Sequence, residues 1–436
     1  MTDRQAIELT RRCVRCGFCL DACPTYRLTR SETQSPRGRL RLMASVMSGE
    51  ADLNADTVEA IDICLGCRAC ETACPSGVQY GHVVEHFRAR IHESGIRARL
   101  QTDVKRGLMS AMENPGLFAT ALAASKRFSA LLRIGTPADG SGVGSSLMPA
   151  PVASILSGTR GDATLMPDTP DDLTVGTLPA HAPAIGPRRA TVCMLQGCVM
   201  RVLYHRTNVA TMRVLQRAGC DVLCPSDAGC CGALDLHAGF MAEGAARARE
   251  LIRSLNALSF DAFVVNSAGC GSTIRDYGHT LADDPTWAKA AAAIAAKTRD
   301  VSEFLDELGI PAPMGRFDAV VTYHDACHLA HGQGVTDAPR RLLAAVPGLK
   351  LVPLRESDTC CGSAGTYNLT QPEMARRLLE RKVDNIMATG ASVVAMGNPG
   401  CMAWIARGLK DRGSNIRVMH VVEILDEALQ AGERGS

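Results

Sequence analysis

The chain has 436 residues, of which 46% are hydrophobic, so it is long enough for two to four domains with packed cores. A formal net charge of only +2 argues against a nucleic-acid-binding protein as a whole. Sixteen of the nineteen cysteines fall in groups with metal-ligand spacing, and the chain has neither a signal peptide nor a run of 18 apolar residues. We therefore expect a cytoplasmic protein that has neither a disulfide framework nor a transmembrane helix.

Two cysteine quartets lie near the N-terminus, and each has the pattern C-x2-C-x2-C-x3-C-P. The first quartet is Cys13, Cys16, Cys19 and Cys23, and the second is Cys64, Cys67, Cys70 and Cys74. This spacing is typical of bacterial two-cluster ferredoxins, in which the fourth cysteine of each run ligates the cluster of the other run. We therefore predict one 4Fe–4S cluster on Cys13, Cys16, Cys19 and Cys74, and a second on Cys64, Cys67, Cys70 and Cys23. Zinc is the alternative, but it usually takes separated C-x2-C pairs.

Residues 1–100 are expected to form this ferredoxin-type unit. Residues 35–50 have a Ser-Pro start and a Gly near their end, which predicts a helix, and residues 83–100 are also expected to be helical. We expect a mostly α-helical unit with the clusters in loops between helices. The first 50 residues carry nine arginines and five acidic residues. These arginines would either offset the negative charge of the clusters and raise their reduction potential, or form a solvated surface.

An internal repeat occupies the C-terminal part of the chain. Residues 101–189 predict a helical segment to about residue 135, followed by a linker rich in Pro, Gly and Ser. From residue 190 onward, each copy of the repeat has a lone cysteine, a Cys-Cys-Gly triplet and a last cysteine. These cysteines are Cys198, Cys230, Cys231 and Cys270 in the first copy, and Cys327, Cys360, Cys361 and Cys401 in the second.

Short runs of β-branched residues precede several of these cysteines. Alternating strands and helices predict two α/β halves with parallel strands, at residues 190–310 and 311–436. The carboxyl ends of such strands collect ligands, and there the cysteines would lie. Four thiolates in each half can hold a further 4Fe–4S cluster, hold a zinc ion or remain dithiols, and the sequence leaves these alternatives open.

The remaining cysteines, and the histidines near Cys327, have structural roles as alternatives to metal binding. Cys193, Cys220 and Cys224 lie outside the repeat, and we expect them to be small buried hydrophobic residues. His324 and His328 flank Cys327 and would share a face if they lay on one helix, so a mononuclear metal site is one interpretation. Hydrogen bonding to a cluster thiolate is the interpretation that we favour.

The two quartets, the SPRGR segment at 35–39 and the two Cys-Cys-Gly repeats, in this order, resemble the iron–sulfur subunits of bacterial glycolate oxidase. The resemblance implies an FAD-containing catalytic partner that converts glycolate to glyoxylate, and a second flavoprotein-like subunit. It also implies electron transfer to a quinone-type acceptor, within a complex at the inner face of the bacterial cell membrane. This chain would only relay electrons, without catalytic residues of its own, since it has no flavin or NAD fingerprint.

Related families are the alternatives. Iron–sulfur subunits of lactate or glycerol-3-phosphate dehydrogenases, and the thiol–disulfide enzymes similar to heterodisulfide reductase, share the same parts. The wider family usually has C-x2-C at the end of each repeat, but Ser267 and Asn398 replace the first cysteine here. This departure weakens the carry-over of the non-cubane cluster of the heterodisulfide reductase relatives, and it favours the glycolate oxidase branch over the disulfide-reducing branch. A scaffold in which the repeats only bind zinc is a third hypothesis.

Overall fold

The structure is a computed structural model that describes residues 1–97, 99–120, 176–310 and 313–435. Most of the predicted linker, and the end of the helical segment before it, lie outside the described residues. The N-terminal unit consists of short helices with the cysteine runs at their ends. These helices are α1 (Asp3–Arg11), α2 (Cys19–Ala22), α3 (Pro24–Thr29), α4 (Pro36–Met47), α5 (Ala55–Asp62), α6 (Ala69–Thr72), α7 (Tyr80–Glu93) and α8 (Arg99–Glu113), with a 3-10 turn η1 (Glu32–Gln34).

Helix α4 is the predicted helix of residues 35–50, and its start follows from the sequence. Ser35 Oγ accepts a hydrogen bond from the Gly38 N–H at 3.0 Å, and Pro36 takes the first helical position. The buried faces of α4, α5 and α7 meet around Met43, Ile61 and Phe87. The N-terminal unit therefore has a hydrophobic core of its own, and its helical character is confirmed.

The first half of the repeat region contains a five-stranded sheet in the order β1-β3-β2-β4-β5. Its strands are β1 (His181–Ala182), β2 (Ala190–Met194), β3 (Cys220–Leu223), β4 (Ala262–Val265) and β5 (Thr298–Asp300). All neighbours are parallel except β1, which precedes the expected boundary at residue 190 and pairs antiparallel with β3. Its helices are α11 (Val199–Leu203), α12 (His205–Arg217), α13 (Ala233–Ala238), α14 (Met241–Asn256), α15 (Ala268–Arg275), α16 (Tyr277–Thr280), α17 (Ala288–Lys297) and α18 (Val301–Leu308).

The second half contains a four-stranded parallel sheet in the order β7-β6-β8-β9. Its strands are β6 (Ala319–Tyr323), β7 (Leu349–Val352), β8 (Val393–Met396) and β9 (Arg417–His420). Its helices are α19 (Cys327–Ala330), α20 (Asp337–Ala344), α21 (Tyr367–Thr370), α22 (Pro372–Met387), α23 (Pro399–Asp411) and α24 (Val421–Gly435). This strand order repeats β3-β2-β4-β5 of the first half, so the sequence repeat is also a structural repeat.

The two halves share one hydrophobic core. Val192 and Val264 of the first sheet belong to the same buried cluster as Val321 and Val393 of the second. Helix α24 of the second half packs against α12 of the first, and α18 packs against α20. Burial of apolar surface between the halves therefore fixes their mutual position.

Polar contacts add to this interface between the halves. His420 of β9 is 1% exposed, and its Nε2 lies 3.0 Å from the carbonyl oxygen of Asn266 in the first half. Its Nδ1 accepts the Val422 N–H at 3.2 Å, so the Nε2 atom carries the proton and donates to Asn266. A neutral imidazole thus satisfies both of its nitrogens inside the interface.

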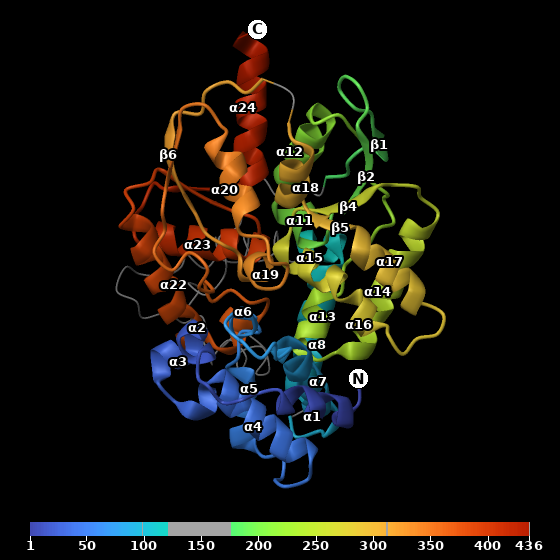
Figure 1. The fold of residues 1–436 in the computed structure, drawn as a ribbon, viewed down its shortest axis with the longest axis vertical. Helices are drawn as coiled ribbons and strands as arrows, with labels where there is room; N and C mark the ends of the chain where they lie inside the picture. The colour runs from blue at the N-terminus through green and yellow to red at the C-terminus, as the bar shows by residue number, and fades with distance from the viewer. Residues whose placement is uncertain (98, 121–175, 311–312, 436) are drawn as a thin grey trace, which may run out of the picture.

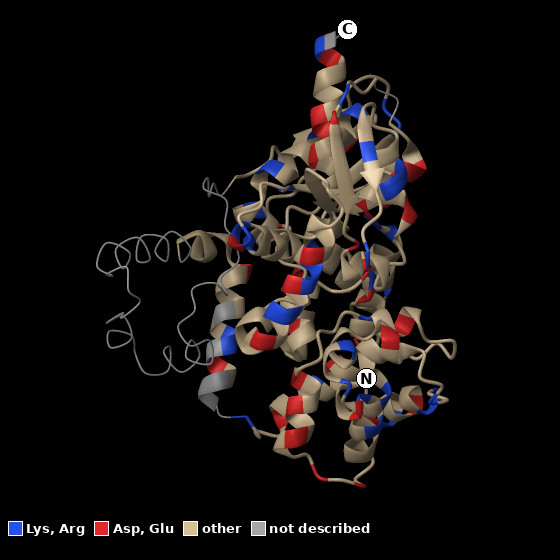
Figure 2. Ribbon diagram, turned by 90° about the vertical axis from the view of Figure 1, so that its left-hand side faces the viewer, with Lys and Arg blue, Asp and Glu red and all other residues tan. Residues whose placement is uncertain are grey.

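The N-terminal unit lies beneath both halves and touches each of them (Figure 1). Arg68 Nη1 is 2.5 Å from Asp276 of the first half, and the Tyr367 hydroxyl of the second half donates to the Ile63 carbonyl at 2.8 Å. Basic and acidic residues are interspersed over the helices of the unit (Figure 2). Among the residues described, no helix is both long and apolar enough to cross a membrane.

Candidate functional site

Four cysteines of the N-terminal unit line one small cavity, and we call Cys23, Cys64, Cys67 and Cys70 the inner quartet. Cys23 comes from the turn between α2 and α3, whereas the other three come from the loop after α5 and from α6. The sequence predicts this set for one 4Fe–4S cluster. Four converging thiols are the donor set that such a cluster takes, so the residues present fit the group.

Positive charge and hydrogen bonds surround the inner quartet. Arg39 is 1% exposed, and its Nη1 lies 3.9 Å from Cys23 Sγ, while the Tyr80 hydroxyl lies 3.5 Å from Cys64 Sγ. Burial alone would raise the pKa of Cys64, but the charges of Arg39 and Arg88 bring it below its usual value. Burial raises the pKa of Cys67 well above its usual value. Arg39 thus supports the interpretation that arginines offset cluster charge.

The remaining ferredoxin cysteines lie nearer the surface, and we call Cys13, Cys16, Cys19 and Cys74 the outer quartet. Cys16 is exposed and the other three are half-buried. Helices α2 and α6, which carry Cys19 and Cys70, pack against each other and bring the two runs together. The assignment of these residues as ligands of one cluster remains a prediction.

A cavity of about 560 Å³ lies where the two halves meet the N-terminal unit. All eight repeat cysteines line it: Cys198, Cys230, Cys231, Cys270, Cys327, Cys360, Cys361 and Cys401. Within each half the lone cysteine lies close to the first of the pair, at 3.5 Å for Cys198 and Cys230 and at 3.9 Å for Cys327 and Cys360. The repeat cysteines therefore face one shared space between the halves.

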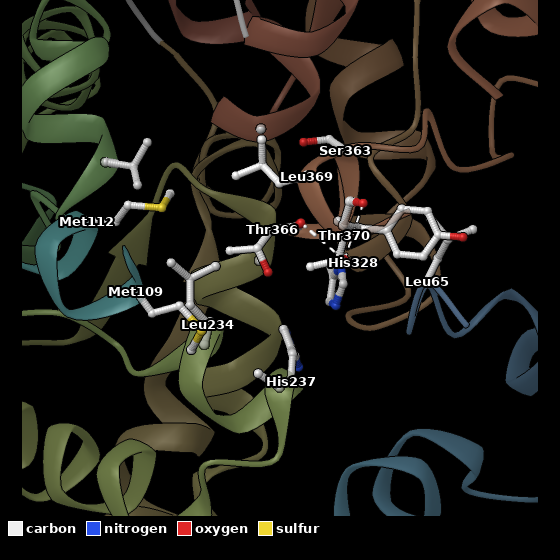
Figure 3. Close-up of a pocket in the computed structure, with 18 of the residues that line it drawn as sticks. Leu65, Met109, Met112, Leu234, His237, His328, Ser363, Thr366, Leu369 and Thr370 are labelled. Carbon is white, nitrogen blue, oxygen red and sulfur yellow. Dashed lines mark hydrogen bonds between the residues drawn. The ribbon is translucent and has the colours of Figure 1, made fainter. Parts of the chain in front are cut away.

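The walls of this cavity are apolar on one side and mixed on the other. Met109, Met112 and Leu234 lie across from Ser363 and Leu65 in Figure 3. Polar lining residues include His237, His328, Thr366 and Thr370. A cavity with a large apolar surface and a few polar groups suits a small amphipathic molecule.

Two basic residues complete the wall near the inner quartet. Arg88 of α7 donates from Nη2 to the Cys64 carbonyl at 2.5 Å and from Nη1 to the His237 carbonyl at 2.7 Å. It thereby ties the second cysteine loop to α13 of the first half. Burial, and then the charge of Arg88, lowers the pKa of Lys105 to about 8.

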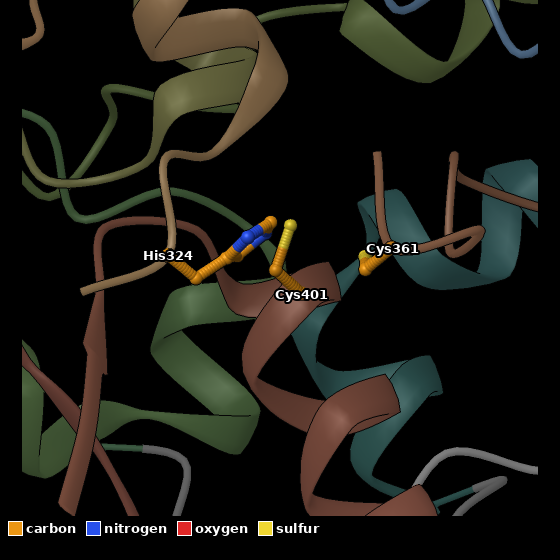
Figure 4. Close-up of side chains that lie close together, drawn as sticks. All are labelled: His324, Cys361 and Cys401. Atoms are coloured by element: carbon orange, nitrogen blue, oxygen red, sulfur yellow. The ribbon is translucent and has the colours of Figure 1, made fainter. Parts of the chain in front are cut away.

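His324 lies close to two cysteines of the repeat. The ligand atoms of His324, Cys361 and Cys401 are all within 4.8 Å of one another, and all three residues are buried (Figure 4). His324 precedes α19, which begins only at Cys327, so His324 and His328 do not share a helix face. His328 does have the favoured position near a thiol, with Nδ1 at 3.6 Å from Cys327 Sγ.

The three cysteines outside the repeat lie in apolar surroundings. Cys193, Cys220 and Cys224 are 0% exposed and belong to the hydrophobic cores of the first half. Burial raises the pKa of each thiol, to about 12, about 11 and about 12 respectively. They are neutral thiols that fill apolar space.

Comparisons with known proteins agree with this architecture. The model of the cysteine-rich domain family matches residues 192–275 and 321–406, and that of the 4Fe-4S dicluster domain family matches residues 10–78. The predicted fold class, a ferredoxin-like unit followed by tandem α/β halves, is therefore confirmed.

Known proteins match this chain over half or more of its length. The chain is 35% identical to the probable glycolate oxidase iron-sulfur subunit of Bacillus subtilis (strain 168), over 97% of this chain and 94% of that protein. It is 31% identical to the glycolate oxidase iron-sulfur subunit of Escherichia coli (strain K12), over 98% and 96%. Lactate utilization protein A of an Exiguobacterium species is 33% identical, over 55% of this chain and 98% of its own length.

Proposed function

The chain belongs to the family of glycolate oxidase iron–sulfur subunits, and from this premise we propose that it receives electrons from an FAD-containing partner that oxidises glycolate to glyoxylate. It passes them to a quinone-type acceptor. The proposed complex includes a second flavoprotein-like subunit and binds peripherally to the inner face of the bacterial cell membrane. This chain relays electrons and contributes no catalytic residue to the oxidation of glycolate.

One observation carries this proposal, namely the position of Cys64. Cys64 lines the small cavity of the inner quartet and also the large cavity between the halves. Cys67 belongs to the same buried cluster as Cys327 and Cys360 of the second half. A cluster on the inner quartet would therefore adjoin the space in which an acceptor can bind.

The residues around the quartets have roles in this relay. The two 4Fe–4S clusters, when bound, supply one-electron carriers, which splits the two-electron output of a flavin into single steps. Cys13, Cys16, Cys19 and Cys74 would hold the outer cluster, and Cys64, Cys67, Cys70 and Cys23 the inner one. Arg39 and Tyr80 place a positive charge and a hydroxyl donor beside the inner quartet, and both favour added negative charge.

The exposed outer quartet is the proposed entry point for electrons. Val14 is 68% exposed and Phe18 is 67% exposed, and both flank Cys16 in the first cysteine loop. Large apolar residues at such exposure typically mark interaction sites when they gather in one place. We assign this loop as the surface that meets the flavoprotein partner.

The large cavity is the proposed exit point. Its apolar wall and polar groups fit the ring of a quinone-type acceptor. The repeat cysteines Cys198, Cys230, Cys231, Cys270, Cys327, Cys360, Cys361 and Cys401 are proposed to hold a further cluster or metal ion there.

The test uses the complex of this chain with its flavoprotein partner, purified without oxygen. Two 4Fe–4S clusters predict about eight irons per chain and two sets of reduced-cluster EPR signals after glycolate is added. Cys67→Ser should leave reduction of the outer cluster intact and abolish quinone reduction, whereas Cys16→Ser should impair both. Quinone reduction at the normal rate in Cys67→Ser, or fewer than about four irons with bound zinc in the unmodified chain, would refute the proposal. Reduction by lactate and not by glycolate would transfer the same relay to a lactate-oxidising partner.

A further inference from the structure

The residue three positions before the lone cysteine is apolar in the first copy of the repeat and a histidine in the second. Leu195 follows β2 and stands three residues before Cys198, whereas His324 follows β6 and stands three residues before Cys327. Leu195 is 1% exposed and packs in an apolar cluster, and His324 is 0% exposed. An apolar side chain therefore fits this place, and burying an imidazole in it costs free energy unless the ring finds partners.

One nitrogen of the His324 ring has a partner and the other has none. Nδ1 lies 3.0 Å from the Ser357 carbonyl oxygen, which can only accept, so Nδ1 carries the proton. Nε2 then holds a lone pair, and this atom is buried without a hydrogen-bond partner among the residues that the structure describes. The backbone fixes the residue as well, because the His324 N–H donates to the Ala395 carbonyl at 2.9 Å.

Two thiols lie close to the His324 ring. Cys361 is 1% exposed and Cys401 is 4% exposed, and their sulfur atoms lie with the His324 nitrogen inside a 4.8 Å limit. Ligand atoms around a tetrahedral zinc ion are roughly 3.5–3.8 Å apart, given Zn–S near 2.3 Å and Zn–N near 2.0–2.1 Å. The three side chains thus need only a small inward movement to meet one ion.

We propose that His324 Nε2, Cys361 Sγ and Cys401 Sγ bind a single zinc ion in the second half. One imidazole and two thiolates are ligands that zinc accepts in tetrahedral sites. Cys361 and Cys401 also line the large cavity, so the fourth ligand, a water molecule or a thiolate, comes from there. The first half, with Leu195, lacks a nitrogen ligand at this position, and its four cysteines form an all-thiol set.

The surroundings match those of a metal-bound histidine. Such histidines usually donate their second ring N–H to a carbonyl or carboxylate, as Nδ1 does here to Ser357. Asn398 Nδ2 lies 3.5 Å from Cys401 Sγ and can donate to a thiolate there. Asn398 is one of the two residues that replace a cysteine of the wider family, and here it becomes a support for the ligand beside it.

The test measures zinc and iron in the full chain, purified without oxygen and washed with a weak chelator. We expect about one zinc per chain, and an X-ray absorption spectrum at the zinc edge that requires both nitrogen and sulfur ligands. His324→Leu installs the residue of the first half, and we expect it to lower the zinc content about tenfold or more without loss of iron. Cys231→Ser and Cys270→Ser, the first-half counterparts of Cys361 and Cys401, should leave zinc in place.

A second variant keeps the test decisive if His324→Leu does not fold. His324→Cys should retain zinc, while the nitrogen contribution disappears from the absorption spectrum. Zinc that is absent from the unmodified chain, or that is retained in full in a folded His324→Leu protein, would overturn the proposal. Iron with sulfide on Cys361 and Cys401 in place of zinc would do the same.

Discussion

Replacing Arg39 by methionine should lower the reduction potential of the inner cluster and leave the outer one almost unchanged. Arg39 Nη1 lies 3.9 Å from Cys23 Sγ, and the side chain is 1% exposed. Its Nε donates to the Ala60 carbonyl at 2.7 Å and its Nη2 to Thr25 Oγ1 at 3.0 Å, so the guanidinium is held in place. A fixed buried cation beside a thiolate favours the more negative, reduced cluster.

The size of the effect follows from the distance to Cys23. Two unit charges about 4 Å apart interact by about 4 kcal/mol at an effective dielectric constant of about 20. The added electron spreads over the whole cluster, so we expect about half of this value, about 2 kcal/mol. Since about 59 mV corresponds to about 1.4 kcal/mol for one electron, the potential should fall by about 90 mV.

An EPR-monitored redox titration of the anaerobic chain measures both clusters in one sample. Arg39→Lys is the matched control, because it keeps the positive charge, and we expect its potential to change by less than half as much. An inner-cluster potential in Arg39→Met that equals the unmodified value, or a shift shared equally by both clusters, would refute the reasoning.

Three further changes test other parts of the structure. Phe18→Glu should weaken binding to the flavoprotein partner about tenfold, or about 1.4 kcal/mol, as measured by calorimetry. Ile185 is 53% exposed and lies outside the first cysteine loop, so Ile185→Glu should leave this binding unchanged. Tyr367→Phe removes the hydroxyl bond to the N-terminal unit and should lower the free energy of unfolding by about 1 kcal/mol in urea; an unchanged midpoint would contradict that contact. Burial lowers the pKa of His420 to about 4, so the fold favours the neutral ring and loses stability as pH falls through the unfolded value near 6.5. Between about pH 6.5 and 5.5 this loss should be about 1 kcal/mol, and it should be absent from His420→Gln.

Much of the fold could be predicted because its signals are local. The Ser35-Pro36 start marks α4, and the strands β2, β4, β6 and β8 are short β-branched runs ahead of the repeat cysteines. The parallel order of the sheets follows from alternating strands and helices. The core shared between the halves gives no such signal, because the apolar faces of α12 and α24 are about 200 residues apart in the sequence.

The inner quartet could be predicted from the sequence, whereas the surroundings of His324 could not. Ligand spacing places Cys23 with the second run, and the structure brings it to Cys64, Cys67 and Cys70. The grouping of His324 with Cys361 and Cys401 depends on three segments that are far apart in the sequence. Helical spacing paired His324 with His328 and not with these cysteines. Aligning the two copies of the repeat would have exposed the change from leucine to histidine, which was the one available signal.

The order in which the chain is synthesised gives the shared core a consequence for assembly. The N-terminal unit closes its own core with α7, so it can fold and take up iron while the ribosome is still making the rest of the chain. The first half depends on the end of the chain, because the face of α12 packs against α24, which is made last. The cavity lined by the repeat cysteines therefore takes shape only after the end of the chain has emerged, against an N-terminal unit whose own core has already formed.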